Sequence, residues 1–143
     1  MIYTHLTNEA MKLAYRAHHG QVDKGGIPYI FHPYHLAEQM EDEYTTCVAL
    51  LHDVVEDTDV TIEELAAIFP AEIVDAVRLM THAKGADYLQ YVAAIRENPI
   101  ARAVKLADIT HNSDKTRLEP SADNEVAQKR WEEKYRKALE ILK

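Results

Sequence analysis

The sequence is poor in cysteine, glycine and proline. Its one cysteine, Cys47, has no partner for an internal disulfide, and a chain of 143 residues can bury a core without one. Four glycines and five prolines are few for this length, which predicts few turns and long helices. A lone cysteine is typical of a reducing compartment, so we expect a cytoplasmic protein.

Long apolar runs and a basic excess are also missing. The longest strongly apolar stretch, residues 47–51, is far shorter than the roughly 20 residues that a membrane span needs. The first ten residues lack the basic and then apolar segments of a secretory signal. Lys and Arg number 16 against 24 Asp and Glu, a net charge of −8, whereas nucleic-acid-binding proteins usually carry a basic excess. We therefore expect neither a membrane nor a nucleic acid as partner.

The spacing of apolar residues along the sequence is typical of helices. Apolar residues recur at helical intervals, and no segment alternates at the period of a β-strand. A capping box at residues 61–64 and the pair Asn98-Pro99 mark two helix starts. Helices are predicted over residues 7–19, 33–40, 42–56, 62–69, 70–81, 87–98, 98–114 and 122–142. The sequence predicts an all-α fold, with residues 1–143 forming a single domain.

One predicted helix gathers an imidazole and three carboxylates on one face. At about 100° per residue, Glu56, Asp53 and Asp57 lie roughly 40°, 100° and 140° from His52, and apolar residues fill the opposite arc. Carboxylates are unfavourable there, because a helix C-terminus carries partial negative charge and like charges one turn apart repel. A bound divalent cation would reverse both penalties. A solvated helix end with its acids in water is the alternative.

Two other segments could complete a cation site. His32 stands directly before Pro33, which keeps it out of a helix interior so that its ring can face a neighbouring helix. One face of the helix over 98–114 carries, within an arc of about 80°, two cations, a carboxylate and an amide: Lys105, Asp108, Asn112 and Lys115. Taken singly, a His-Pro loop and a surface aspartate would explain these segments.

Read together, these segments resemble the HD superfamily of metal-dependent phosphohydrolases. They are more closely similar to the hydrolase domain of the RelA/SpoT-homolog family, over about residues 10 to 117. The resemblance rests on AHHGQ at 17–21, PYIFHP at 28–33, LLHDVVEDT at 50–58 and KLAD with HN at 105–112. It implies a compact helical HD-domain fold. A chain of 143 residues leaves no room for a synthetase domain, so the likeness is to the small, single-domain alarmone hydrolases.

The resemblance also implies a reaction and a role for particular residues. The reaction would release the 3′-pyrophosphate of guanosine 3′,5′-bis(diphosphate), ppGpp, leaving GDP. The metal, manganese as the usual ion, would be held by His32, His52, Asp53 and Asp108, a set that suits a borderline cation. The attacking water and its proton would be handled by Glu56 and Asp57. In the substrate site, Asn112 would contact the nucleotide near its 3′ side, and Lys24 and Lys105 would offset phosphate charge.

Two acidic residues depart from the family pattern. Asp23 stands where the family usually has an arginine that lies against the guanine base, and Asp114 stands at a second arginine position. A carboxylate cannot stack or donate as a guanidinium does. Another nucleotide or a small phosphate ester therefore remains an alternative substrate. If the base lies where the resemblance places it, Asp23→Arg should improve affinity for guanine nucleotides.

Two readings without catalysis also remain. One is a nucleotide-binding sensor module, which would be expected to lose metal ligands or the two catalytic acids. The other is a structural helical protein that uses its last helix as a partner surface. Trp131 and Tyr135 on that helix could dock it on the core or make a homo-oligomer contact. His18 could orient its turn or simply pack, and His111 could support a metal ligand or lie on the helix surface.

Overall fold

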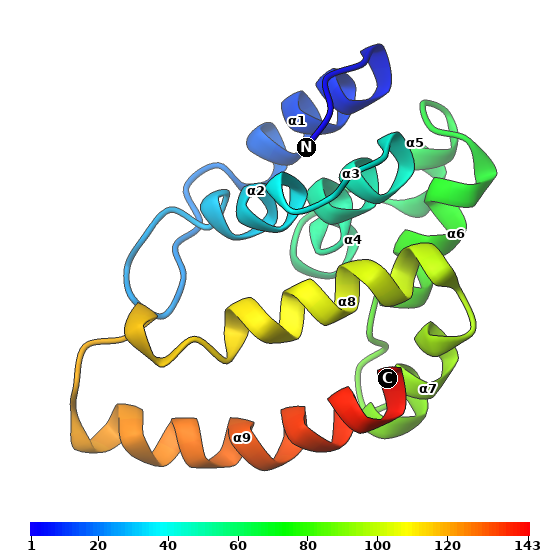
Figure 1. The fold of residues 1–143 in the computed structure, drawn as a ribbon. Helices are drawn as coiled ribbons and strands as arrows, with labels where there is room; N and C mark the ends of the chain where they lie inside the picture. The colour runs from blue at the N-terminus through cyan, green and yellow to red at the C-terminus, as the bar shows by residue number, and fades with distance from the viewer.

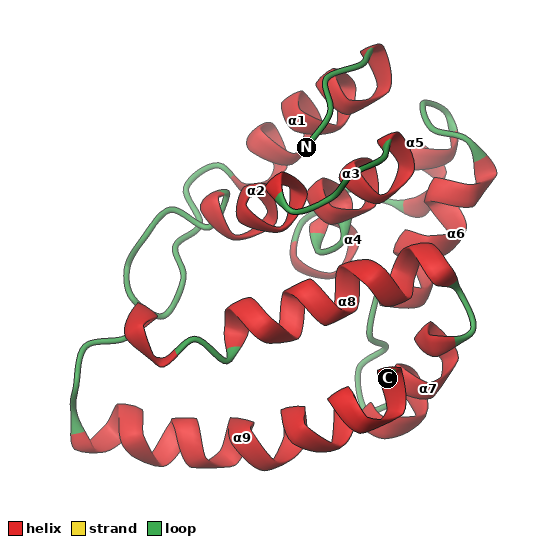
Figure 2. Ribbon diagram, in the orientation of Figure 1, coloured by secondary structure: helices red, strands yellow, loops and turns green.

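The computed structural model describes residues 1–143 as nine α-helices and one short 3-10 helix (Figures 1 and 2). The elements are α1 His5–His18, α2 Phe31–Glu38, α3 Glu43–Leu51, α4 Val54–Asp57, α5 Ile62–Ala66, α6 Ala71–Met80, α7 Tyr88–Arg96, α8 Pro99–Asn112, η1 Lys115–Arg117 and α9 Ala122–Leu142. No strand forms, and the one isolated β-bridge joins Val22 to Pro28. The predicted all-α fold is confirmed.

Helix α3 is the centre of the core. Every residue from 45 to 51 is buried, so this helix is enclosed on all sides. It packs against α1 and α2 on one side and against α6 and α8 on the other (Figure 1). Apolar side chains from the surrounding helices join it in one cluster of 26 buried residues. The C-terminal end of this enclosed helix is therefore held in place by the core, so the side chains that follow it have defined positions.

The last helix packs on the core only toward its C-terminus. Ala138 and Leu142 are fully buried, whereas most of the first half of α9 is exposed. α9 lies along α7 and α8, and η1 joins it to the end of α8 (Figure 1). No helix in the structure combines the length and the apolar character needed to cross a membrane.

Side-chain caps set several helix starts where the sequence predicts them. Thr61 accepts a hydrogen bond from the Glu64 amide, and Asn98 accepts one from the Ala101 amide at 3.0 Å. Each cap satisfies an amide that has no partner within its helix. The Asn98 cap fixes where α8 begins, and with it the direction of the polar face along that helix.

The structure differs from the predicted helix over 42–56. α3 ends at Leu51 and α4 begins at Val54, with Asp53 at φ −109° and ψ 0° between them. His52 Nδ1 lies 2.7 Å from the Ala49 carbonyl oxygen, the group that would accept from the Asp53 amide in a continuous helix. The His52 side chain thus competes with the Asp53 amide for the Ala49 carbonyl oxygen, and this disfavours a continuous helix. A single helical wheel therefore does not describe residues 42–56.

The predicted face along residues 98–114 is also shorter than expected. α8 ends at Asn112, and Lys115 lies in η1. Its ammonium is 2.5 Å from Glu132 Oε1 on α9, so it ties the two segments together. The prediction that Lys115 shares a face with Lys105 and Asp108 is wrong, because the chain leaves the helix before reaching it.

Candidate active site

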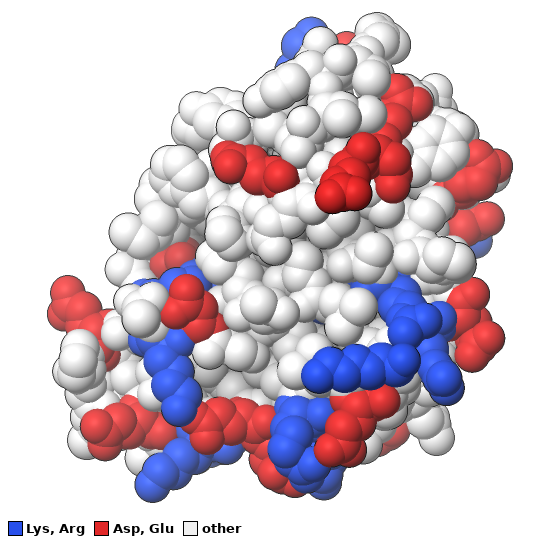
Figure 3. Space-filling view, viewed as in Figure 1, with Lys and Arg blue, Asp and Glu red and all other residues white.

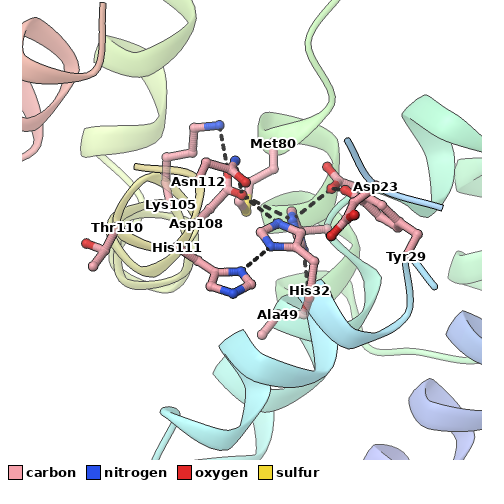
Figure 4. A network of polar contacts seen from close by, with 12 residues as sticks. Asp23, Tyr29, His32, Ala49, Met80, Lys105, Asp108, Thr110, His111 and Asn112 are labelled. Atoms are coloured by element: carbon pink, nitrogen blue, oxygen red, sulfur yellow. Dashed lines mark hydrogen bonds and ion pairs between the residues drawn. The ribbon is translucent and has the colours of Figure 1, made fainter. Parts of the chain in front are cut away.

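Four side chains from three segments converge beside the break between α3 and α4. His32 comes from the first turn of α2, His52 and Asp53 form the break itself, and Asp108 reaches across from α8. His32 Nε2 lies 2.9 Å from Asp108 Oδ1, and His52 Nε2 lies 3.0 Å from Asp53 Oδ2 and 3.6 Å from Asp108 Oδ1. Figure 4 shows His32 facing the polar side chains of α8. The structure thus brings together all four residues expected as ligands.

The donor set fits a divalent cation. Ligand atoms of His32, His52 and Asp53 all lie within 4.8 Å of one another. Because a carbonyl only accepts, His52 Nδ1 donates its proton to Ala49, and the Nε2 atom of the ring then faces two carboxylates. His52 Nε2 is buried, and although two carboxylates lie close to it, neither makes a hydrogen bond with it. A cation between this nitrogen and the carboxylates would satisfy all three groups.

The electrostatics show the same concentration of negative charge. Burial opposes a charged His52, yet the Asp53 and Asp108 carboxylates raise its pKa well above the usual range. Burial would raise the pKa of Asp108, but the Lys105 ammonium and the two histidines hold it well below normal. Lys105 Nζ lies 2.9 Å from Asp108 Oδ2. Asp108 is therefore ionised, and its two oxygens face the histidines and a lysine.

Each histidine also has a partner at its other ring nitrogen. His32 Nδ1 lies 2.7 Å from His111 Nδ1. Burial, followed by the nearby Arg117 and His32, lowers the pKa of His111 to about 4, so this ring is neutral and can accept. Such outer partners fix the orientation of metal-binding histidines. Of the two expectations for His111, the structure supports contact with a candidate ligand.

Two residues of the first motifs, neither of them among the expected site residues, support the cluster from outside. The Tyr29 hydroxyl donates to Asp53 Oδ2, and its ring packs between His18 and His32. His18 is buried and donates to Gln21 Oε1 at 2.8 Å, so it both packs and orients the turn. Gln21 in turn donates to the backbone carbonyl of Asp57. Their positions inside PYIFHP and AHHGQ were the only sequence signal for these contacts.

A pocket of about 240 Å³, here called the acidic pocket, opens onto the cluster. Asp53 and Asp108 line it together with both expected catalytic acids. Glu56 Oε1 accepts from the His82 amide at 2.6 Å, which holds that side chain in place. Burial, Asp53 and Glu56 raise the pKa of Asp57 to about 6. Asp57 can therefore exchange a proton near neutral pH, as general acid–base work requires.

A second pocket of about 350 Å³ adjoins the first and is here called the Trp131 pocket. The linings of the two pockets share Tyr29, Asn112 and Tyr135. The three expected substrate residues divide between them. Lys24 lies in the Trp131 pocket with its ammonium 4.2 Å from the Trp131 ring centre, Lys105 lies in the acidic pocket, and Asn112 lies at the boundary. Asn112 Nδ2 donates to Asp108 Oδ1 at 3.1 Å.

Asp23 has a structural function in the wall of the Trp131 pocket. Its Oδ1 accepts from the amides of Gly25 and Ile27, and its Oδ2 accepts from Arg117 at 3.2 Å. Arg117 also donates to the Asn112 side chain at 3.3 Å. A Cβ on Gly25 would lie 3.0 Å from the Arg117 carbonyl oxygen, so the loop and η1 are in close contact. The carboxylate charge is thus offset by a guanidinium from η1.

Comparison with known families identifies the fold. The HD domain matches residues 10–140, which includes the whole cluster. The chain belongs to the HD-domain family. An HD domain binds a divalent metal through histidine and aspartate, in agreement with the His32, His52 and Asp53 group.

Curated relatives of this HD domain include much longer proteins. It is 34% identical over 134 residues to the bifunctional (p)ppGpp synthase/hydrolase SpoT of Escherichia coli, covering 78% of the chain and 19% of SpoT. It is 39% identical over 123 residues to the guanosine-3′,5′-bis(diphosphate) 3′-pyrophosphohydrolase of Vibrio cholerae, covering 73% of the chain and 17% of that protein. The chain thus spans less than a fifth of the length of these relatives.

A solved structure of similar size also matches this HD domain. It is a metazoan ortholog of SpoT that hydrolyses ppGpp, with a TM-score of 0.78 and 25% sequence identity. The match covers 100% of the chain and 88% of the metazoan protein. The resemblance to the RelA/SpoT-homolog hydrolase domain is therefore confirmed across the whole fold.

Proposed function

We propose that this HD domain is a metal-dependent phosphohydrolase that removes the 3′-pyrophosphate of ppGpp and leaves GDP. One observation carries the proposal: the buried cluster opens into a pocket with two catalytic acids, and a second pocket of nucleoside size adjoins it. The similarity to a metazoan ppGpp hydrolase over the full chain supports this substrate.

The residues divide the chemistry among them. His32, His52, Asp53 and Asp108 hold the cation, which when bound polarises a phosphoryl oxygen and lowers the pKa of water. Asp57, with its raised pKa, takes the proton of the attacking water, and Glu56 orients that water from its anchored position. Lys105 offsets phosphate charge from the acidic pocket, Lys24 does so from the Trp131 pocket, and Asn112 contacts the nucleotide near its 3′ side.

The reaction is a hydrolysis with one bond formed and one broken. The water oxygen bonds to the inner phosphorus of the 3′-diphosphate, and the bond between that phosphorus and the ribose 3′ oxygen breaks. One proton of the water passes to the protein, and the 3′ oxygen receives a proton. Both phosphates leave together as pyrophosphate, and no side chain becomes a covalent nucleophile.

Three further points belong to the proposal. Two imidazoles with two carboxylates suit a borderline cation, and manganese is our choice. Residues 1–143 act as one catalytic unit, since all the long helices contribute to one core. Cys47 is a free and buried thiol whose pKa is raised to about 12 by burial and by Glu43, so it is unreactive and suits a cytoplasmic setting.

A hydrolase of another nucleotide is the second candidate. It is favoured by Asp23, because the carboxylate occupies a position where the family places an arginine against guanine. Arg117, the nearby guanidinium, is bonded to Asp23, His111 and Asn112. The base in the Trp131 pocket would then be recognised by other groups.

Metal-stripped protein with and without added Mn²⁺ tests the proposal. We would measure release of GDP and pyrophosphate from ppGpp beside a panel of other nucleotides. Two variants serve as controls. Asp53→Ala should lose both bound metal and activity, whereas Glu56→Ala should keep the metal and lose about 100-fold or more in turnover.

Each outcome decides between the candidates. Manganese-dependent release of both products from ppGpp supports the proposed reaction. Turnover of a different phosphate ester with no action on ppGpp keeps the hydrolase and overturns the substrate. A protein that holds metal and turns over nothing would favour the sensor module. Wild-type turnover by Glu56→Ala would contradict the role of that carboxylate.

A further inference from the structure

Lys134 is a cation of the acidic pocket that the motifs do not contain. It projects from α9 and lines the pocket beside Lys105 of α8. Both ammonium groups approach one aromatic ring: Lys134 Nζ lies 4.2 Å and Lys105 Nζ lies 5.8 Å from the centre of the Tyr88 ring. The two positive charges therefore lie together on the side of the pocket formed by α7, α8 and α9.

Lys134 is also without an acidic partner, unlike its neighbours. Lys137, one turn further along α9, lies 3.8 Å from Glu133, and Lys105 pairs with Asp108. In Figure 3 most Lys and Arg side chains of the visible face lie in the lower half, over α8 and α9, with acidic side chains among them. No carboxylate lies within 4 Å of the Lys134 ammonium, since none of the ion pairs includes it.

Other cations act on Lys134 instead. Burial lowers its pKa, and the charges of Lys105 and Lys24 lower it further. Lys24 lies over Trp131, one turn before Lys134 on α9. Like charges held together at a partly enclosed surface repel, and an anion between them removes the penalty. Lys105 and Lys134 in the acidic pocket, with Lys24 in the adjoining Trp131 pocket, therefore mark an anion site at the edge of the acidic pocket.

The other residues that line the pocket define what this anion is. The candidate metal ligands Asp53 and Asp108 and the two catalytic acids line the same pocket, so the phosphorus under attack must sit beside them. A 3′-diphosphate has a second phosphate beyond the reacting one, and a pocket of about 240 Å³ has room for both. We propose that Lys134, with Lys105, binds this outer phosphate and makes the pocket selective for a diphosphate over a monophosphate. This inference rests on the proposed function and adds a specificity residue to it.

Inorganic pyrophosphate and inorganic phosphate are the probes that test it. Calorimetric titration of the manganese-loaded protein should show that Lys134→Ala weakens pyrophosphate binding about tenfold while phosphate binding stays within twofold. The KM for ppGpp should rise with it. Lys134→Arg should restore most of the affinity, because it keeps the charge. Lys137→Ala is the matched control on the same helix and should behave as wild type.

The possible failures can be told apart. Unchanged pyrophosphate affinity in Lys134→Ala, or an equal loss for both anions, would overturn the role of Lys134. Thermal melting of each variant shows whether the fold is intact, and Lys134→Arg guards against a purely structural effect. A wild-type protein that binds pyrophosphate but hydrolyses no nucleotide would contradict the proposed function and leave this anion site standing.

Discussion

At the residue scale, Tyr29 is the side chain that connects two motifs. Its hydroxyl donates to Asp53, and its ring contacts His18 and His32. Tyr29→Phe should keep the ring packing and release the Asp53 carboxylate from its partner. Loss of such an outer contact typically weakens metal binding roughly 10- to 100-fold. Titration of the variant with Mn²⁺ by calorimetry measures this directly.

A matched tyrosine provides the control. Tyr44 is partly buried near the start of α3, at the opposite end of that helix from His52. Tyr44→Phe should bind Mn²⁺ as the wild type does. If Tyr29→Phe also kept its affinity within twofold, the hydroxyl would not be orienting Asp53.

The sequence predicted the four candidate ligands but not the groups that hold them. His32, His52, Asp53 and Asp108 stand in motifs whose residue types suit a cation, and the structure brings them together. His111 could not be assigned, because its contact with His32 joins residues 79 apart in the chain. The sequence did not predict a role for Lys134 for a different reason. On a helix with many charged residues, only the fold shows which lysine faces a pocket.

At the scale of elements, the loop between α1 and α2 depends on Asp23. From the family pattern, an arginine at this position should improve binding of guanine nucleotides. The structure predicts the reverse for Asp23→Arg, because two amides lose their acceptor and two guanidinium groups face each other. We expect a loss of about 1–2 kcal/mol in stability and a higher KM for ppGpp, measured by thermal melting and by kinetics.

Asp23→Asn separates the two effects. It keeps an oxygen for the amides of Gly25 and Ile27 and removes only the charge that faces Arg117. Its melting temperature should stay closer to wild type than that of Asp23→Arg. A lower KM with unchanged melting in Asp23→Arg would show that contact with the base outweighs the loop.

Helix starts were more predictable than helix breaks. Thr61 and Asn98 act through amides three residues away, so the local sequence contains the whole interaction. The break after Leu51 depends on how His52 turns toward Ala49, and η1 depends on contacts with α9 and with the loop at Asp23. Neither follows from periodicity, which records only which face of a helix is apolar.

At the scale of the molecule, one cation would connect segments that span most of the chain. The candidate ligands come from α2, from the junction of α3 and α4, and from α8. Binding to the folded state alone should stabilise it by about 2.7 kcal/mol when free Mn²⁺ is 100 times its dissociation constant. We expect the melting temperature to rise by roughly 5–10 °C, as measured by calorimetry.

Removal of a ligand should abolish this shift. Asp53→Ala should melt at the same temperature with Mn²⁺ as with a chelator, although its apolar core is unchanged. A manganese-induced shift that survives in Asp53→Ala would place the stabilising ion elsewhere. Mg²⁺ and Ca²⁺, compared at the same concentration, would show how selective the site is.

The distance along the chain between the ligands has a consequence for folding kinetics. His32 and Asp108 touch although 76 residues separate them, and the helices that carry them both dock on α3. Closing so long a loop costs entropy, and this cost must be offset by other contacts before His32 and Asp108 meet. We therefore expect the site to assemble late, after the transition state. Interactions absent from the transition state change the unfolding rate and leave the folding rate nearly unchanged. The cation should therefore extend the lifetime of the native state without speeding its formation.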